Sequence, residues 1–484
     1  MKQIWRWVTL SLLTVLFCLL PAQAQVSQQD SQVPSGIALS RVGTPQVHFV
    51  YHEAPLLSFG GLSDFTFYAA EDAFNYQLWV DWAAEHGMNH LRAYPPFSWK
   101  YVEKFAEENG GAKENVLFPY EETQPGSRKF DLTTFNDAYW KRFREQCEYL
   151  QSQGIIIHLL MMNGWQLRPE EKNWGGHFFN PTNNINSFTD VLGNNRLGFY
   201  QSVDKQQSEL VRAQQAWLEK IVETTADLDN VYYDLVHEIA ENYEDWSAMQ
   251  AWIEVMAQTV RSRFAELQSS RPIILGMDTG GLNGSQRHWI FSRPYFDVLI
   301  YGKSHRVRQA KDWRKRYKKP YIPQEAWDEN NQKYGFREPD TRAHLRKYLW
   351  KFMMAKCQQM DVYIKPRADE QLPGFPHNYD PNGWNLFEED ALVLREIWNQ
   401  LKDYPNLEFV GNVNTGPGEE HYVLSSVVEA LVYVSSGVGD QDISYDANRL
   451  NLRGLALQDG LYTASIVDPV RGTLSTEQVV VGNG

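Results

Sequence analysis

Cysteine is scarce in this chain of 484 residues, which contains three of them. Cys18 lies in an N-terminal leader, and Cys147 and Cys357 lie in helix-like stretches. The sequence has no Cys-x-x-Cys pair, which argues against a zinc ribbon. We expect Cys147 and Cys357 to be buried free thiols, although a disulfide between them is compatible with an oxidising compartment.

Basic residues are also in short supply. The 46 Lys and Arg against 60 Asp and Glu give a formal net charge of −14. So acidic a surface is a poor partner for phosphate backbones, which disfavours nucleic-acid binding. The chain is 43% hydrophobic and 22% charged, which excludes a disordered protein and supports a large core.

Apolar runs long enough to span a membrane are missing after the first 24 residues. Those residues have the pattern of a cleavable signal peptide: Lys2 and Arg6, a short apolar run at 8–20, and Ala22-Gln23-Ala24 as the cleavage site. A lipoprotein signal at Cys18 is the alternative, disfavoured by the bulky Phe17. The sequence predicts a secreted or periplasmic protein without membrane insertion after cleavage.

What the sequence does contain is a repeat of strand, loop and helix. After a predicted linker at 25–46, short aliphatic runs alternate with amphipathic stretches of helical length. The expected strands are 56–59, 89–94, 155–160, 231–236, 273–276, 298–301, 321–324 and 362–365. The expected helices are 74–85, 135–153, 209–226, 246–268, 310–317 and 340–359. This order predicts an α/β fold, a (β/α)₈ TIM barrel over 47–410.

The pattern changes to strands alone near the C-terminus. The expected strands are 423–433, 450–457, 460–467 and 476–481, separated by turn residues such as Asp459-Gly460. A small C-terminal β-sandwich domain over 411–484 is therefore predicted.

Two glutamates end expected strands of the barrel, where catalytic residues of this fold lie. Glu238 follows the run at 230–236, and Glu325 follows the run at 319–324. A carboxyl at the end of a buried strand needs a partner or a chemical role, and two that face one cavity suit glycoside cleavage. Glu238 paired with an arginine, or Glu325 solvated among other acids, are the structural alternatives. Glu241 is the local rival of Glu238.

The segments around these glutamates resemble the clan A retaining glycoside hydrolases, a cellulase-like group centred on family 5. The matching segments are Gly87-Met88-Asn89-His90-Leu91-Arg92, Phe130-Asp131-Leu132, residues 230–238 and residues 319–325. The resemblance covers roughly 47–400 and implies Glu238 as the acid/base, Glu325 as the nucleophile and Arg92 as the support of the nucleophile. The last 70 or so residues resemble small β-sandwiches of the collagen-binding type.

His237 departs from that pattern, because the clan has Asn before the acid/base. In the clan this Asn bonds a sugar hydroxyl, and a His can donate the same bond with a pH dependence of its own.

Further candidates for substrate binding follow other strands. Tyr301 and His305 lie at the end of the sixth expected strand, and Trp384 in the loop after the eighth is a candidate for stacking on a sugar ring. Trp165, Trp174 and Trp327 are weaker candidates, and simple packing is the alternative for each. The Asn-rich segment 178–184 is expected to face the cleft and to read sugar hydroxyls.

Together these features predict a retaining glycosidase that acts on an oligo- or polysaccharide and needs no metal or organic cofactor. A non-catalytic carbohydrate-binding or adhesion protein and a transglycosylase are the alternatives. The sugar, the linkage, endo or exo action and the oligomeric state stay open.

Overall fold

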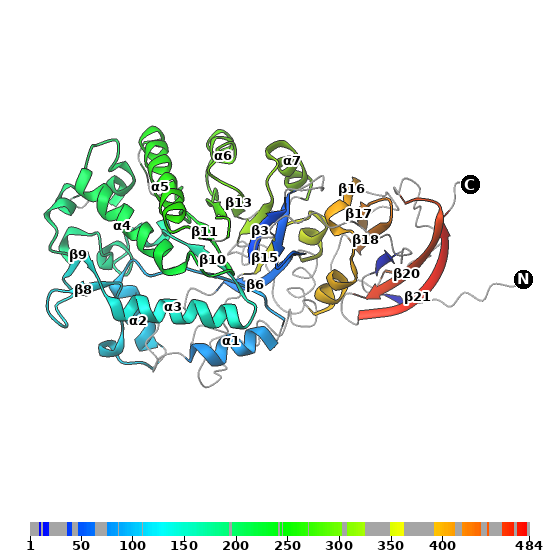
Figure 1. Ribbon diagram of the computed structural model, residues 1–484, viewed down its shortest axis with the longest axis horizontal. Helices are drawn as coiled ribbons and strands as arrows, with labels where there is room; N and C mark the ends of the chain where they lie inside the picture. Colours follow the sequence, from blue (N-terminus) through cyan, green and yellow to red (C-terminus); the bar gives the residue numbers. More distant parts are fainter. Residues whose placement is uncertain are drawn as a thin grey trace, which may run out of the picture.

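The protein combines parallel strands, surrounding helices and a C-terminal antiparallel sheet, as the computed structural model in Figure 1 shows. The structure describes residues 9–10, 13–18, 36–40, 47–62, 75–85, 87–108, 110–192, 196–240, 243, 245–269, 271–302, 307–324, 349–362, 392–411, 419–436, 443–444, 457–468 and 472–481.

Strands in all eight expected places form the parallel part of the fold. They are β6 (Ser58–Leu62), β7 (His90–Ala93), β10 (Ile156–Leu160), β11 (Val231–Asp234), β12 (Leu275–Gly276), β13 (Leu299–Gly302), β14 (Tyr321–Gln324) and β15 (Gln359–Val362). Six pair in the order β12-β11-β10-β7-β6-β15, and β13 pairs with β14. All of these pairs are parallel. The eighth strand begins three residues earlier than expected.

Backbone contacts connect the two sheets at both of their free edges. Asp278, just after β12, forms an isolated parallel bridge with Ile300 of β13. At the other edge, the Gln358 N–H donates to the carbonyl of Tyr321 at 3.0 Å, which joins β14 to the start of β15.

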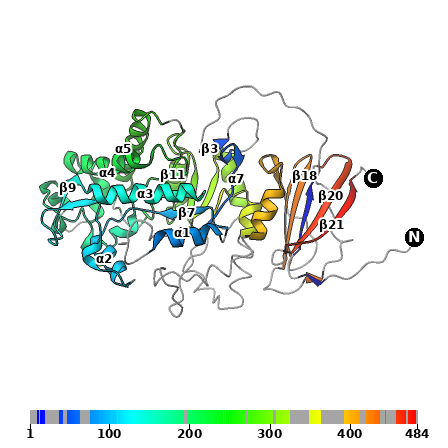
Figure 2. The same ribbon diagram turned by 60° about the horizontal axis from the view of Figure 1, so that its bottom comes forward.

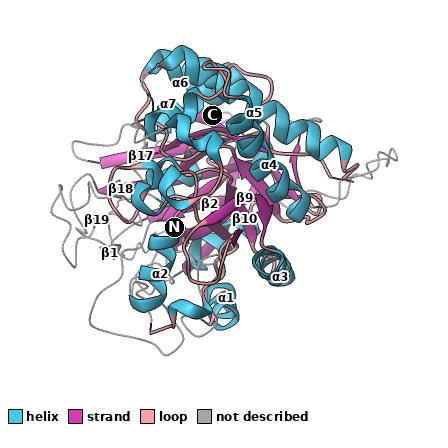
Figure 3. Cartoon of the chain, turned by 90° about the vertical axis from the view of Figure 1, so that its left-hand side faces the viewer, coloured by secondary structure: helices cyan, strands magenta, loops and turns pink. Residues whose placement is uncertain are grey.

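Helices surround these strands (Figure 3). They are α1 (Tyr76–Glu85), α2 (Trp99–Glu108), α3 (Asp137–Ser152), α4 (Ser208–Thr225), α5 (Trp246–Glu266), α6 (Gly284–Phe291) and α7 (Val307–Tyr317). Residues 349–354 and 392–400 are also helical. Side chains cap the N-termini of several of these helices. Asn136 accepts from two N–H groups of α3, and Asn283 with Gln286 forms a capping box on α6. The sequence analysis did not predict α2 and α6.

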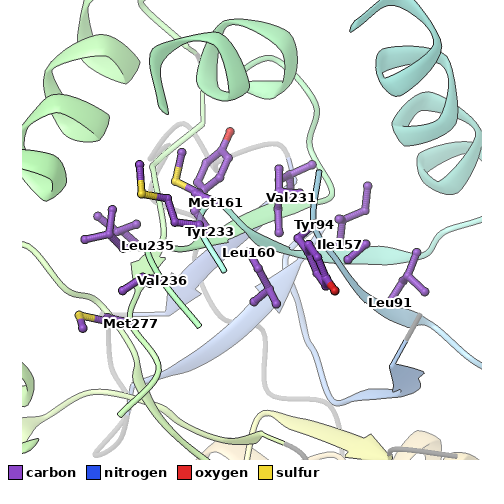
Figure 4. Packing of buried hydrophobic residues seen from close by; sticks show 14 of the residues in the cluster. Leu91, Tyr94, Ile157, Leu160, Met161, Val231, Tyr233, Leu235, Val236 and Met277 are labelled. Atoms are coloured by element: carbon purple, nitrogen blue, oxygen red, sulfur yellow. The ribbon is translucent and has the colours of Figure 1, made fainter. Parts of the chain in front are cut away.

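Alternate residues of each strand enter two different cores. Leu91, Ile157, Val231 and Tyr233 belong to the large core that strands and helices share, and Figure 4 shows them packed together. Their neighbours along the strands point to the other side, where a second cluster of buried residues fills the space between the strands. Its members are Ile156, Tyr232, Ile274, Val298, Ile300 and Ile322, with Ile37 and Phe49 packed against them.

Ile37 and Phe49 come from a short antiparallel sheet that covers the amino-terminal ends of the parallel strands. It consists of β3 (Ile37–Ser40), β4 (His48–Tyr51) and β5 (Ala54–Pro55), and the Ile37 N–H donates to the carbonyl of Asp229, just before β11, at 2.7 Å. Part of the segment expected as a linker therefore belongs to the folded core.

A long loop follows β10 on the opposite, carboxyl-terminal side. It contains five short 3₁₀ turns: Gly164–Leu167, Trp174–Gly176, Pro181–Asn183, Ser187–Leu192 and Arg196–Gln201. Before α3, the antiparallel pair β8 (Tyr120–Glu122) and β9 (Phe130–Phe135) packs beside it, and Phe130 contacts Phe178 of the loop at a ring distance of 4.8 Å.

The C-terminal region is a six-stranded antiparallel sheet. Its order is β16-β17-β18-β2-β20-β21, with β16 (Glu408–Gly411), β17 (Glu419–Ser425), β18 (Glu429–Ser436), β20 (Gly460–Asp468) and β21 (Gly472–Val481). The expected single strand at 423–433 was wrong: a turn at 426–428 divides it, and the Ser426 N–H donates to the carbonyl of Glu429 at 2.7 Å.

The fourth strand of this sheet comes from the other end of the chain. Strand β2 (Leu13–Cys18) lies between β18 and β20 and is antiparallel to both, from Leu13 opposite Val434 to Cys18 opposite Thr463. Residues Thr9–Leu10 (β1) pair with Ile443–Ser444 (β19). Part of the predicted signal peptide thus lies within the sheet, as the blue strand among orange and red ones in Figure 2.

Side chains and backbone join the sheet to the α/β region. The rings of Trp350 and Tyr433 stack at 5.3 Å and 5°. The carboxylate of Glu429 accepts from the N–H groups of Lys402 and Asp403, at 3.1 and 3.0 Å. Both Cys147 and Cys357 are buried and free, so the alternative of a disulfide between them is wrong. Within the described part of the chain, we find no helix with the length and apolarity to span a bilayer.

Candidate active site

Glu238 lies four residues beyond β11, at the carboxyl-terminal end of the parallel strands. Its backbone is left-handed, with φ 50°, and its N–H donates to Asp278 Oδ2 at 3.2 Å. The loop after β10 supports it from the other side, because the Gly164 N–H donates to the carbonyl of His237 at 2.7 Å. A Cβ on Gly164 would lie 2.4 Å from the Glu238 carbonyl oxygen, so only glycine permits this approach.

The carboxylate of Glu238 pairs with Arg168 from the same loop. Arg168 Nη2 lies 3.1 Å from Glu238 Oε2, and the two side chains are 33% and 27% exposed. The sequence analysis had weighed an arginine partner as the structural alternative for this residue. Because both groups reach solvent, the pair is screened and a substrate can reach the carboxyl.

Asp278, two residues after β12, accepts three hydrogen bonds. Its Oδ2 accepts from His237 Nδ1 at 3.1 Å and from the Glu238 N–H, and its Oδ1 accepts from the Gly280 N–H at 2.8 Å. Burial alone would raise the pKa of Asp278, but the hydrogen bonds from His237, Gly280 and Glu238 outweigh it, and the pKa is lowered. Asp278 is therefore a buried carboxylate.

Asp234, the last residue of β11, lies below Asp278, and its pKa is shifted in the opposite direction. Its Oδ1 accepts from the Asp278 N–H at 3.0 Å. Burial, followed by the negative charge of Asp278, raises the pKa of Asp234 to about 8, so the carboxyl is protonated at neutral pH. His158 Nε2 lies 3.5 Å from Asp234 Oδ2, and burial lowers the pKa of His158 well below its usual value. The layer beneath Glu238 is thus polar but mostly neutral.

Arg92 belongs to this same layer. It is 1% exposed, on the face of β7 opposite to Leu91 and Ala93, which enter the outer core. Its register partner on β10 is His158, and its positive charge contributes to the lowered pKa of His90 and of His158. The structure therefore brings Arg92, His237 and Glu238 to one end of the strands.

Tyr301 is not brought into this group. The guanidinium of Arg287 in α6 lies 3.8 Å from the centre of its ring, and the ring of Trp313 in α7 meets it edge-on at 5.3 Å. Its neighbour Ile300 occupies the inner cluster, so Tyr301 faces the helices instead. Glu325, His305 and Trp384, like Glu241 and Trp327, lie outside the described residues, so the distance between the Glu238 and Glu325 carboxyls stays a prediction.

The aromatic candidates after β10 differ from each other. Trp165 is partly exposed, and its ring meets Tyr101 edge-on at 5.2 Å with Lys172 Nζ 5.3 Å from its centre. Trp174 is buried and packs on His177 at 5.2 Å. Trp165 therefore keeps a surface for a ligand, whereas Trp174 is largely packed.

The side-chain amides of the Asn-rich segment bond within their own loop. The side-chain amides of three buried asparagines donate to backbone carbonyls of the loop itself: Asn180 to Trp174, Asn183 to Gly175 and His177, and Asn184 to Phe178 and Asn180. The prediction that these amides face the cleft is wrong, because they hold together a loop without regular structure.

Sequence reasoning missed Asp234, Asp278, His158 and Arg168. Asp278 could have been found, because it follows the aliphatic run Ile273-Ile274-Leu275 in the same way that Glu238 follows its own strand. Asp234 and His158 stand out only as polar residues inside apolar strands. Nothing in the sequence marks Arg168. No group of three or more potential metal ligands occurs among the described residues.

Known proteins give this geometry a context. Residues 83–357, more than half of the chain, match the family model "Apiosidase-like, catalytic domain". A crystal structure of a glycoside hydrolase family 5 protein from Bacteroides vulgatus is similar at a TM-score of 0.54, with 11% identity over 93% of this chain and 91% of that one. A second crystal structure, of a putative glycoside hydrolase from Bacteroides vulgatus, is similar at a TM-score of 0.52, with 13% identity over 88% of this chain and 82% of that one.

At these identities the likeness to the solved structures supports the fold, and no curated protein matches the chain. The family match carries more, because it covers the parallel strands from β7 to β14, the loop after β10 and the residues around Glu238. The chain therefore belongs to the Apiosidase-like family and is a glycoside hydrolase.

Proposed function

We propose that this protein is a secreted retaining glycosidase in which Glu238 is the acid/base and Glu325 the nucleophile. In the first step, a carboxylate oxygen of Glu325 bonds to the anomeric carbon while the bond to the leaving oxygen breaks, and Glu238 gives its proton to that oxygen. In the second step, Glu238 takes a proton from water, whose oxygen displaces Glu325 from the sugar.

The observation that carries the proposal is the position of Glu238. Its carboxyl is partly exposed at the carboxyl-terminal end of the strands, while the layer below it is buried. In the free protein Arg168 Nη2 lies 3.1 Å from Glu238 Oε2. The proposal requires substrate to separate this pair, so that Glu238 is protonated when the leaving oxygen departs.

The architecture that we propose for this chemistry is a closed (β/α)₈ barrel. The contacts of Asp278 with Ile300 and of Gln358 with Tyr321 support closure at both sheet edges. We likewise propose that the C-terminal sheet is one half of a β-sandwich, with the β1–β19 pair as part of the second layer.

The proposed substrate is an oligo- or polysaccharide. The description of the matching family makes glycosides of apiose the first to test, before aryl glucosides, mannosides and plant polysaccharides. Trp165 follows Gly164, which contacts the backbone of His237 and Glu238, and its partly exposed ring suits a sugar.

The test combines a substrate screen with two variants. Once a substrate is found, Glu325→Gly should abolish hydrolysis, and added azide should restore turnover through an azide adduct of inverted configuration. Glu238→Ala should slow substrates with poor leaving groups by about a hundredfold or more, and activated aryl glycosides far less. Glu122→Ala is the matched control, because Glu122 is a paired carboxylate that contacts Arg128 at 2.9 Å far from the site.

The stereochemistry of the product decides the mechanism. Proton NMR of the first-formed sugar should show the anomeric configuration of the substrate retained. An inverted product, or more than about a tenth of the activity left in Glu325→Gly, contradicts the assignment. Transfer to an added sugar in place of water identifies a transglycosylase, and binding without turnover identifies a carbohydrate-binding protein.

A further inference from the structure

Asp278 and His237 form a buried pair directly behind the backbone of Glu238. Their side chains are 3% and 7% exposed, and His237 Nδ1 lies 3.1 Å from Asp278 Oδ2. The same oxygen accepts the N–H of Glu238, and the other oxygen accepts the N–H of Gly280. One carboxylate thus contacts both the residue before the acid/base and the acid/base itself.

We propose that Asp278 is a positioning residue of the active site, which acts by fixing the ring orientation and the tautomer of His237. Nδ1 must carry a proton to donate to the carboxylate, which makes Nε2 the acceptor nitrogen of the neutral ring. This inference rests on the proposed role of Glu238.

The surroundings favour this role over that of a simple loop contact. Besides His237, the backbone N–H groups of Glu238 and Gly280 donate to Asp278, so the position of the carboxylate is defined without the imidazole. The backbone of His237 is fixed as well, since its N–H donates to the Met162 carbonyl at 2.9 Å and its carbonyl accepts from Gly164. With main chain and Nδ1 both fixed, little rotational freedom remains for the ring.

Other charged and titratable groups face the pair. Asp234 lies below Asp278, His158 and Arg92 lie in the same layer, and Glu238 with Arg168 lies toward the solvent. Asp278 is the carboxylate in contact with the ring, so replacing it changes the environment of His237 first.

The direct test is the tautomer of His237, read by NMR on protein labelled with ¹⁵N-histidine. The wild-type spectrum should contain a neutral imidazole with its proton on Nδ1, and that signal should be missing in His237→Asn. In Asp278→Ala the signal should move to the Nε2-protonated form or to a mixture of both. A ring protonated on Nε2 in the wild type overturns the proposal.

The second test is a double-mutant cycle on kcat/KM. Asp278→Asn should lower kcat/KM at least tenfold in the wild-type background. In the His237→Asn background the loss should be at least fivefold smaller, because the imidazole that Asp278 positions is absent. Equal losses in both backgrounds mean that Asp278 acts through the Glu238 backbone or the fold alone, and overturn the proposal.

Asp297→Asn is the control for loss of a buried carboxylate. Asp297 is 8% exposed and contacts Arg261 Nη2 at 2.6 Å, before β13 and at the far end of the strands. This variant should leave the His237 signal and kcat/KM unchanged. If no glycoside is cleaved at all, the proposed function fails while the NMR result still decides the role of Asp278.

Discussion

At the scale of the residue, the buried carboxyl of Asp234 makes the stability of the folded protein depend on pH. Its pKa is about 8 in the folded protein because of burial and the charge of Asp278, against 3.8 for an ordinary aspartate. Between these values the unfolded chain loses a proton that the folded protein keeps. Its contribution to stability is therefore full below pH 4 and is lost as the pH rises to about 8.

Asp234→Asn removes this titration but keeps an oxygen that can accept from the Asp278 N–H. We expect the melting temperature of the wild type to fall more between pH 5 and pH 8 than that of Asp234→Asn, with the largest difference at pH 8. Calorimetry of both proteins across that range is the measurement. Parallel profiles would show that Asp234 is ionised in the folded protein.

The same scale shows why sequence identified Glu238 but not its surroundings. Glu238 ends an apolar run and matches a family pattern, so its type and place mark it. Arg168 lies 70 positions away in sequence and reaches Glu238 because 3₁₀ turns fold the loop back over the strand end. That contact depends on loop geometry, and loops lack the periodic hydrophobic pattern by which helices and strands are predicted from sequence.

At the scale of the element, apolar runs in the sequence located the parallel strands, but the ends of the helices were harder to predict. The expected helix 340–359 extends too far, because the described helix ends at 354 and β15 begins at Gln359. Lys356 has a left-handed φ of 56° in the turn between them, a conformation usually marked by glycine. Without that glycine, the sequence carried no signal of the end.

Gly164→Ala tests the contact between the loop after β10 and the end of β11. The added methyl would lie 2.4 Å from the Glu238 carbonyl oxygen, so backbone must shift. We expect kcat/KM to fall at least tenfold while the far-UV circular dichroism stays that of the wild type. Gly284→Ala is the matched control, because a Cβ there meets nothing within 4 Å at the start of α6, and it should be neutral. Equal activity of the two variants would contradict the role of this contact.

At the scale of the whole molecule, the C-terminal sheet packs on the α/β region through an aromatic contact. Trp350 and Tyr433 are both fully buried, and removal of the sheet would expose the Trp350 face. A chain that ends before residue 418 is therefore expected to lose solubility before it loses the site.

Tyr433→Ala tests this contact within the full chain. It should lower the melting temperature by several degrees, as large-to-small changes in a core do, while kcat/KM of the folded protein stays within about twofold. Val427→Ala, on an exposed residue in the turn between β17 and β18, should change neither. A marked loss of kcat/KM in folded Tyr433→Ala would show that the sheet contributes to the site.

If the protein is exported as proposed, two events compete for strand β2: cleavage of the signal peptide, and pairing of β2 with β18 and β20 in the C-terminal sheet. The leader leaves the ribosome roughly 20 to 80 s before β18 and β20, at usual rates of synthesis, so a signal peptidase meets it unpaired. If cleavage comes first, the place of β2 between β18 and β20 becomes a gap about 10 Å wide. Two rows of backbone groups along that gap then lack hydrogen-bond partners. The mature protein must then close that gap or fill it with another strand. The mass of the exported chain shows which event comes first.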